Sequence, residues 1–70
     1  MILESTYENK NRKAFIYSST YDTTYTVEYM INGRIVNRTH HQTLKLAEQL
    51  ANDYTDEAGL EPKFLNEETQ

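Results

Sequence analysis

The sequence predicts a small α+β domain: an antiparallel meander of four strands, or of three, followed by one C-terminal helix packed on one sheet face. The first observation is Asn32-Gly33 between two β-rich runs at 25–31 and 34–39. A type I′ hairpin turn needs positive φ at both central residues, and Asn and Gly tolerate that best. The second is an apolar stripe at helical spacing in the segment that follows. The third is the length of 70 residues, which allows one domain.

Two further strands precede the hairpin. Residues 2–8 alternate between the two faces of a strand, and residues 13–19 are rich in aromatic and β-branched side chains. Polar turns at 9–12 and 20–23 separate the runs. Because these connections are short, we expect each strand to pair with the next one along the chain.

A helix is predicted over about residues 42–58. Its apolar stripe consists of Leu46, Ala47, Leu50, Ala51, Tyr54 and Ala58. Two start signals compete, since residues 39–42 have the spacing of a capping box and Thr43 is a plain N-cap. Gly59 suits a left-handed position after the helix, and Pro62 prevents its continuation.

We expect residues 1–65 to form the single domain and residues 66–70 to be a disordered acidic tail. Phe64-Leu65 is an apolar pair in this polar end of the chain. The pair either docks on the helix or a sheet edge and completes the core, or stays exposed as a short motif for a partner.

The charge is unevenly distributed, with a net value of −4. Residues 1–52 hold five acids and six bases (net +1), and residues 53–70 hold six acids and one base (net −5). This balance argues against general nucleic-acid binding, which needs clustered Lys and Arg. The acidic end suits a solubilising tail, or a surface that imitates a phosphate backbone.

The composition indicates a cytoplasmic protein. The chain has no Cys, which excludes disulfides and thiolate metal sites. No apolar run approaches the roughly 20 residues of a membrane span, and the first residues lack the basic and apolar regions of a signal peptide. We therefore expect no membrane partner.

The Asn-Gly turn predicts the register of the hairpin and, through it, the two faces of the sheet. The expected pairs are Ile31 with Arg34, Met30 with Ile35, Tyr29 with Val36, and Val27 with Arg38. The face toward the helix is expected to carry Leu3, Ser5, Tyr7, Ala14, Ile16, Ser18, Tyr25, Val27, Tyr29, Ile31 and Val36, with Arg34 and Arg38 near its edge.

The opposite face is the candidate binding surface. It is expected to carry Glu4, Thr6, Phe15, Tyr17, Thr26, Glu28, Met30, Ile35 and Asn37, with Asn37 opposite Glu28. One helix covers one face, so Phe15, Tyr17, Met30 and Ile35 form an apolar patch of the kind that marks interaction sites. Four readings stay open: a protein interface (a homodimer included), a cover formed by the C-terminal segment, Tyr and Met side chains that are merely tolerated in water, and RNA or single-stranded DNA stacked on Phe15 and Tyr17.

No catalytic or cofactor signature is present. His40-His41 has no carboxylate or Cys at metal-ligand spacing, which favours a structural or capping role. Both glycines are assigned to turns, so no phosphate-binding loop remains, and no Ser has a recognisable base nearby. We expect no enzymatic activity, no metal and no cofactor.

Four segments together resemble very small uncharacterised accessory proteins of tailed bacteriophages, particularly those that infect marine cyanobacteria. These segments are Tyr25-Thr26-Val27, Asn32-Gly33-Arg34-Ile35-Val36, Ala47-Glu48-Gln49-Leu50-Ala51 and Phe64-Leu65-Asn66-Glu67. The resemblance implies a viral protein in the host cytoplasm that binds a host enzyme, polymerase or nuclease stoichiometrically. A looser similarity is to the sheet-plus-helix DNA-binding domains of phage integrases, which need a basic sheet face that this sequence lacks.

The sequence thus predicts a non-enzymatic protein–protein interaction module, and the resemblance to phage proteins implies that it binds and modulates a host protein. The candidate partner-binding residues are Phe15, Tyr17, Glu28, Met30, Ile35, Asp53, Asp56 and Glu57. The alternatives are a sheet that binds nucleic acid, an acidic nucleic-acid mimic and a structural homodimer.

Overall fold

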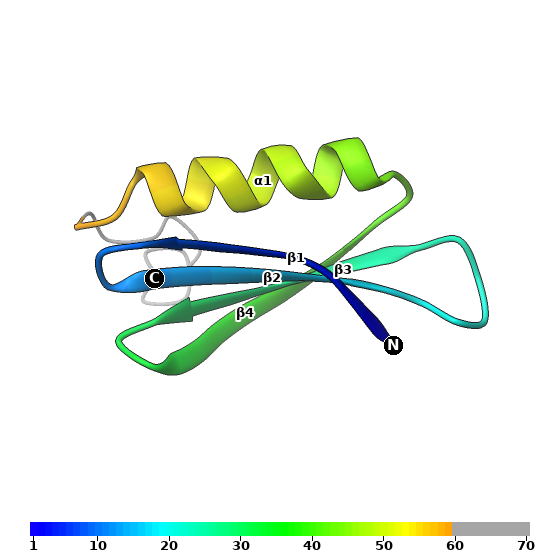
Figure 1. Ribbon diagram of the computed structural model, residues 1–70, viewed down its shortest axis with the longest axis horizontal. Helices are drawn as coiled ribbons and strands as arrows, with labels where there is room; N and C mark the ends of the chain where they lie inside the picture. Colours follow the sequence, from blue (N-terminus) through cyan, green and yellow to red (C-terminus); the bar gives the residue numbers. More distant parts are fainter. Residues whose placement is uncertain (60–70) are drawn as a thin grey trace, which may run out of the picture.

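The computed structural model describes residues 1–59 and shows the predicted α+β architecture. Four antiparallel strands lie in the order of the sequence: β1 (Ile2–Asn9), β2 (Arg12–Ser18), β3 (Tyr25–Ile31) and β4 (Arg34–His41). The helix α1 (Leu44–Asp56) then crosses one face of the sheet (Figure 1). We call the face away from α1 the open face. The predicted domain end at residue 65, the tail at 66–70 and the pair Phe64-Leu65 lie outside the described residues.

The turns confirm the hairpin prediction. Asn32 and Gly33 have φ values of 51° and 80°, as a type I′ turn requires. The first hairpin is closed by Lys10 and Asn11, where Lys10 also has a positive φ of 53°. The backbone N–H of Asn32 donates to the carbonyl of Asn11 over 2.8 Å, which ties the two hairpin turns together.

A bulge in β4 changes the register that the turn predicts. From the turn outwards, the pairs are Ile31 with Arg34, Met30 with Ile35, Tyr29 with Asn37, Glu28 with Arg38, and Val27 with Thr39. The first two pairs confirm the prediction. The pairing of Tyr29 with Val36 and of Val27 with Arg38 is wrong, because one extra residue enters β4 and shifts every later residue by one position.

The shift exchanges the faces of several β4 side chains. Arg38, predicted toward the helix, lies opposite Glu28 on the open face. Asn37, predicted on the open face, lies opposite Tyr29, whose ring is in the core. Val36 still packs against the core, as expected.

A second bulge, in β1, corrects the placement of Leu3. The register shifts between Leu3 and Ser5, so Glu4 is the extra residue. Leu3 pairs with Tyr17 and therefore lies on the open face, 52% exposed, and not toward the helix as predicted. Both bulges lie on the edge strands of the sheet.

The core lies between the sheet and α1. Its buried apolar residues are Ala14, Ile16, Val27, Tyr29, Ala47, Ala51 and Tyr54, with Tyr7, Tyr25, Val36 and Leu44 packed around them. The rings of Tyr29 and Tyr54 meet edge to face at 5.0 Å. Burial raises the pKa of the Tyr54 hydroxyl, which donates to the Met30 carbonyl over 2.8 Å.

The helix begins later than predicted, and one residue of its predicted apolar stripe is exposed. It begins after Thr43, whose hydroxyl accepts the N–H of Leu46 over 3.2 Å, so the plain N-cap is the correct start signal. The capping box at 39–42 is wrong, because β4 continues to His41. Leu46, predicted in the apolar stripe, is 44% exposed, since the buried stripe runs through Ala47, Ala51 and Tyr54.

The helix end also differs in detail. Glu57 is the C-cap, so α1 ends two residues before the predicted end at residue 58. Gly59 has a φ of 96°, which confirms the expected left-handed conformation.

Candidate functional site

The open face is built from three rows of side chains that run across the strands. Residues paired in neighbouring antiparallel strands point to the same face, so the register defines each row. The rows are Leu3, Tyr17, Thr26 and His40; Thr6, Phe15, Glu28 and Arg38; and Glu8, Lys13, Met30 and Ile35. Among residues 1–59, α1 is the one helix, and it lies on the other face (Figure 1).

Apolar and aromatic side chains occupy the middle and two corners of this face. The rings of Phe15 and Tyr17 lie side by side with centroids 6.4 Å apart. Both rings and Met30 are half-buried, while Leu3 and Ile35 are 52% and 48% exposed. Exposed apolar groups of this kind, rimmed by polar ones, are typical of interaction surfaces.

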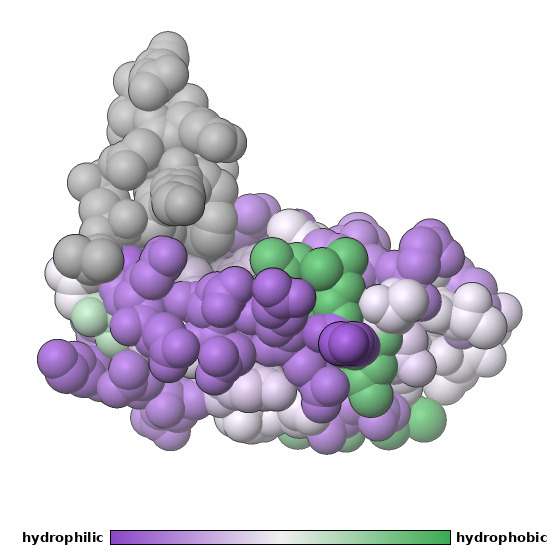
Figure 2. All heavy atoms as spheres, turned by 90° about the horizontal axis from the view of Figure 1, so that it is seen from above, coloured by the Kyte–Doolittle hydropathy of each residue, from purple (hydrophilic) through white to green (hydrophobic). Residues whose placement is uncertain are grey.

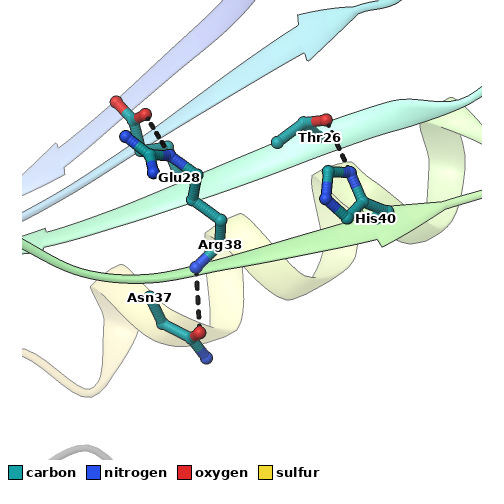
Figure 3. A network of polar contacts seen from close by, with 5 residues as sticks. All are labelled: Thr26, Glu28, Asn37, Arg38 and His40. Atoms are coloured by element: carbon teal, nitrogen blue, oxygen red, sulfur yellow. Dashed lines mark hydrogen bonds and ion pairs between the residues drawn. The ribbon is translucent and has the colours of Figure 1, made fainter.

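An ion pair lies between the apolar groups. Arg38 Nε donates to Glu28 Oε2 over 2.8 Å (Figure 3). The Glu28 side chain is 15% exposed and that of Arg38 is 58% exposed, so the carboxylate is shielded and the guanidinium faces outward. Next to this pair, Thr26 Oγ1 and His40 Nδ1 lie 2.9 Å apart. These polar groups are already hydrogen-bonded to one another, so they can orient a bound partner. Burying them would remove little water from unpaired charges.

Asn37 is not the partner of Glu28. Its Oδ1 accepts the backbone N–H of Arg38 over 2.9 Å, and Figure 3 shows its side chain apart from the Glu28–Arg38 pair. The structure thus replaces the predicted Glu28–Asn37 pair with an ion pair.

The predicted partner-binding residues fall into two separate groups. Phe15, Tyr17, Glu28, Met30 and Ile35 share the open face. The acids Asp53, Asp56 and Glu57 belong to α1 and its C-cap, on the other side of the sheet, and they form no common site with the first group. From the helix side the surface is largely hydrophilic, crossed by a hydrophobic band (Figure 2).

His40 and His41 point to opposite faces of β4 and form no joint site. His41 Nε2 lies 2.6 Å from Thr39 Oγ1, which is in turn 3.0 Å from the Tyr29 hydroxyl. Burial, followed by the neighbouring His40, lowers the pKa of His41. Within the described residues no group of three His, Cys, Asp or Glu side chains is placed to hold a metal ion.

Five open-face residues are not in the predicted set for that face: Leu3, Glu8, Lys13, Arg38 and His40. Leu3, Arg38 and His40 reach this face through a bulge or through the unpredicted continuation of β4. The sequence carries no local signal for either bulge, because neither involves a Gly or a Pro.

Comparison of the chain with protein families, curated proteins and solved structures found no match. In residues 1–59 there is no helix with the length and apolar character needed to cross a membrane.

Proposed function

We propose that this chain is a non-enzymatic protein-binding module whose binding surface is the open face. The observation that carries the proposal is the one-sided arrangement of the fold. The core needs only one face of the sheet, yet the other face presents Phe15, Tyr17, Met30 and Ile35 around a preformed ion pair. Aromatic residues, Met and Arg are the types enriched at interface centres.

The edges of the sheet are less suited to recognition than the face. Both edge strands carry a bulge, one at Glu4 in β1 and one at Val36 in β4. Bulges at sheet edges interrupt the regular row of free N–H and C=O groups that a pairing strand would need. We therefore assign partner binding to the face and not to strand addition.

The charges of the open face favour a protein over a nucleic acid. Arg38 is paired with Glu28, and Lys13 Nζ lies 3.8 Å from Glu8 Oε2. Nucleic-acid binding depends on cations that are free to replace counterions at phosphates. With its bases opposed by acids, this face supports a protein partner, as in a phage-type protein that binds and modulates a host protein.

Two exposed aliphatic side chains on opposite sides of the molecule provide a matched test. Ile35 on the open face is 48% exposed, and Leu46 on the outer side of α1 is 44% exposed. Ile35→Asp should abolish capture of specific proteins from a lysate of cells in which the chain functions, measured by quantitative mass spectrometry. Leu46→Asp should retain them.

Circular dichroism spectra that match the wild type would show that both variants fold. Capture of the same proteins at the same levels by the wild type and both variants would contradict the proposal. So would a loss confined to Leu46→Asp, which would move the binding surface to the helix side.

A further inference from the structure

The open face holds balanced charges, whereas the helix side of the molecule is acidic. The three rows of the open face contain two acids and two bases, which are Glu8, Glu28, Lys13 and Arg38. In α1 and its C-cap there are four acids and one base. Copies of a negatively charged chain repel one another least where the facing surfaces carry no net charge. With His neutral, the open face is such a surface, so two copies can approach through it.

The exposed charges of the open face are ordered from one edge of the sheet to the other. Glu8 lies on the edge strand β1, and its side chain is 60% exposed. Arg38 lies on the opposite edge strand β4, where Glu28 holds its Nε and its side chain is 58% exposed. The face thus has an acid at its β1 border and a base at its β4 border. A partner that presents these charges in reverse order is complementary to it.

A second copy of the chain presents the reverse order when it is turned over about an axis parallel to the strands. Strand β1 of one copy then lies over β4 of the other, and β2 lies over β3. Glu8 comes one row, about 7 Å along the strand, from Arg38 of the second copy, a distance that two long side chains span. The ring of Tyr17 lies over the smaller side chain of Thr26 of the second copy. Each contact occurs twice, because a twofold interface repeats it.

Charge disfavours the other twofold arrangement. An axis across the strands leaves the middle row on itself, so Glu28 meets Glu28 of the second copy and Arg38 meets Arg38. Like charges opposed across an interface are unfavourable. Pairing along the sheet edges is disfavoured as well, because both edge strands carry a bulge.

The size of the open face sets the strength of such a dimer. The four strands are seven or eight residues long. With strands about 4.8 Å apart and a rise of about 3.3 Å per residue, the face covers roughly 450 Å². Two faces together bury roughly 900 Å², which is the size of weak, reversible interfaces. We therefore expect the dimer to form and dissociate with concentration.

We propose that the open face binds a second copy of this chain, sheet against sheet, with β1 of each copy over β4 of the other. The dimer adds an apolar layer, formed by Phe15, Tyr17, Met30 and Ile35, to a core that lies on one side of the sheet. Oligomerisation is a common source of stability for chains of this size. This assignment rests on the proposed function, since it names a partner for the same surface. A foreign protein that binds there must displace the second copy.

Sedimentation velocity over a range of micromolar concentrations tests the dimer. The wild type should change reversibly from monomer to dimer as its concentration rises. Ile35→Asp, which places a charge on the open face, should raise the dissociation constant roughly tenfold. Leu46→Asp places the same charge on the outer side of α1 and should leave the constant unchanged. A wild type that stays monomeric throughout overturns the proposal, as does a dimer that Ile35→Asp leaves intact.

Charge reversal tests which strands face each other. Glu8→Lys brings an ammonium group near Arg38 of the second copy, so it should weaken the dimer roughly tenfold. Asp53→Lys makes the same change in charge on α1 and should dimerise like the wild type. The double variant Glu28→Lys/Arg38→Glu keeps an ion pair within the sheet but reverses the charge at the β4 border, so it should also weaken the dimer.

A mixture of Glu8→Lys with the double variant should restore association, because each acid at a border then meets a base of the other variant. If the double variant does not fold, Arg38→Gln takes its place, and its mixture with Glu8→Lys should associate more strongly than either variant alone. A mixture that associates no better than its components overturns the proposed arrangement of strands.

Capture from a lysate separates this dimer from the proposed function. A monomeric wild type that still captures other proteins through Ile35 overturns the dimer and leaves the proposed function standing. A chain that dimerises as described, but captures no other protein, supports the dimer and contradicts binding of a foreign protein.

Discussion

Adjacent histidines at the end of β4 have different environments. His40 lies on the open face beside Thr26, whereas His41 contacts Thr39 on the side of the core. The two side chains differ because successive residues of a strand point to opposite faces. Burial on the core side disfavours the charged form of a histidine. Burial lowers the pKa of His41, so its protonation should oppose folding in mild acid.

We expect the free energy of unfolding to fall as the pH is lowered from above to below the ordinary pKa of histidine, near 6.5. The pKa of His41 is lowered in the folded chain, so the unfolded chain binds more protons in that range and protonation favours unfolding. His41→Gln should flatten this dependence, measured by denaturant unfolding at neutral and mildly acidic pH. An equal slope in the variant would show that other groups cause the effect.

Single residues also show what the sequence alone can reveal about the site. The period of two in β2 makes Phe15 and Tyr17 neighbours on one face, and the structure places them so. The same period would have put Arg12 on the core face, two residues before Ala14, but its position after Asn-Lys-Asn suggested a turn. The partner of Glu28 was unpredictable, because it depends on one inserted residue in another strand.

At the scale of elements, local chemistry predicts the turns and the helix start, and it misses the bulges. The turn depends on the φ values of Asn32 and Gly33 alone. The helix start depends on the side-chain oxygen of Thr43 alone. A bulge depends on how two strands pack and twist over their whole length. Consequently the strands were predicted to within a few residues, while the faces of Leu3 and Arg38 were predicted wrongly.

The stability of the hairpin between β3 and β4 should depend on whether an L- or a D-residue replaces Gly33. Gly33 has a φ of 80° and open space within 4 Å of the position of a Cβ atom, so a side chain there meets conformational strain and no clash. Gly33→Ala should lower the free energy of unfolding by about 1–2 kcal/mol. Denaturant unfolding measures this loss.

A chain synthesised with D-alanine at position 33 is the matched control. D-residues adopt positive φ without strain, so this chain should be at least as stable as the wild type. If L- and D-alanine destabilise equally, the loss comes from a contact of the side chain and not from the backbone conformation.

At the scale of the whole molecule, sheet and helix share one core and should unfold together. Ala47, Ala51 and Tyr54 of α1 bury the central residues of β2 and β3, and neither layer has a second core among the described residues. A 70-residue chain buries little surface beyond what stability requires. The folded state therefore depends on both layers at once.

We expect helical circular dichroism and tyrosine fluorescence to report the same denaturant midpoint. The chain has six Tyr and no Trp, so fluorescence reports on tyrosines distributed over the sheet, its loop and the helix. Coincident transitions are the mark of two-state unfolding. Loss of the helical signal at a lower denaturant concentration than the fluorescence change would show that α1 detaches from an intact sheet.

The two small residues of α1 that face the sheet limit which substitutions the fold can accept during evolution. Ala47 and Ala51 are fully buried, so the helix lies close to the strands and any larger side chain there would push the layers apart. Saturation mutagenesis selected for folding should accept almost nothing but the smallest residues at these positions, while tolerating wide variation at Leu3 and Ile35. If the open face binds a partner as proposed, selection for binding should reverse that tolerance there, so two such screens would separate residues that maintain the fold from residues needed for the proposed binding.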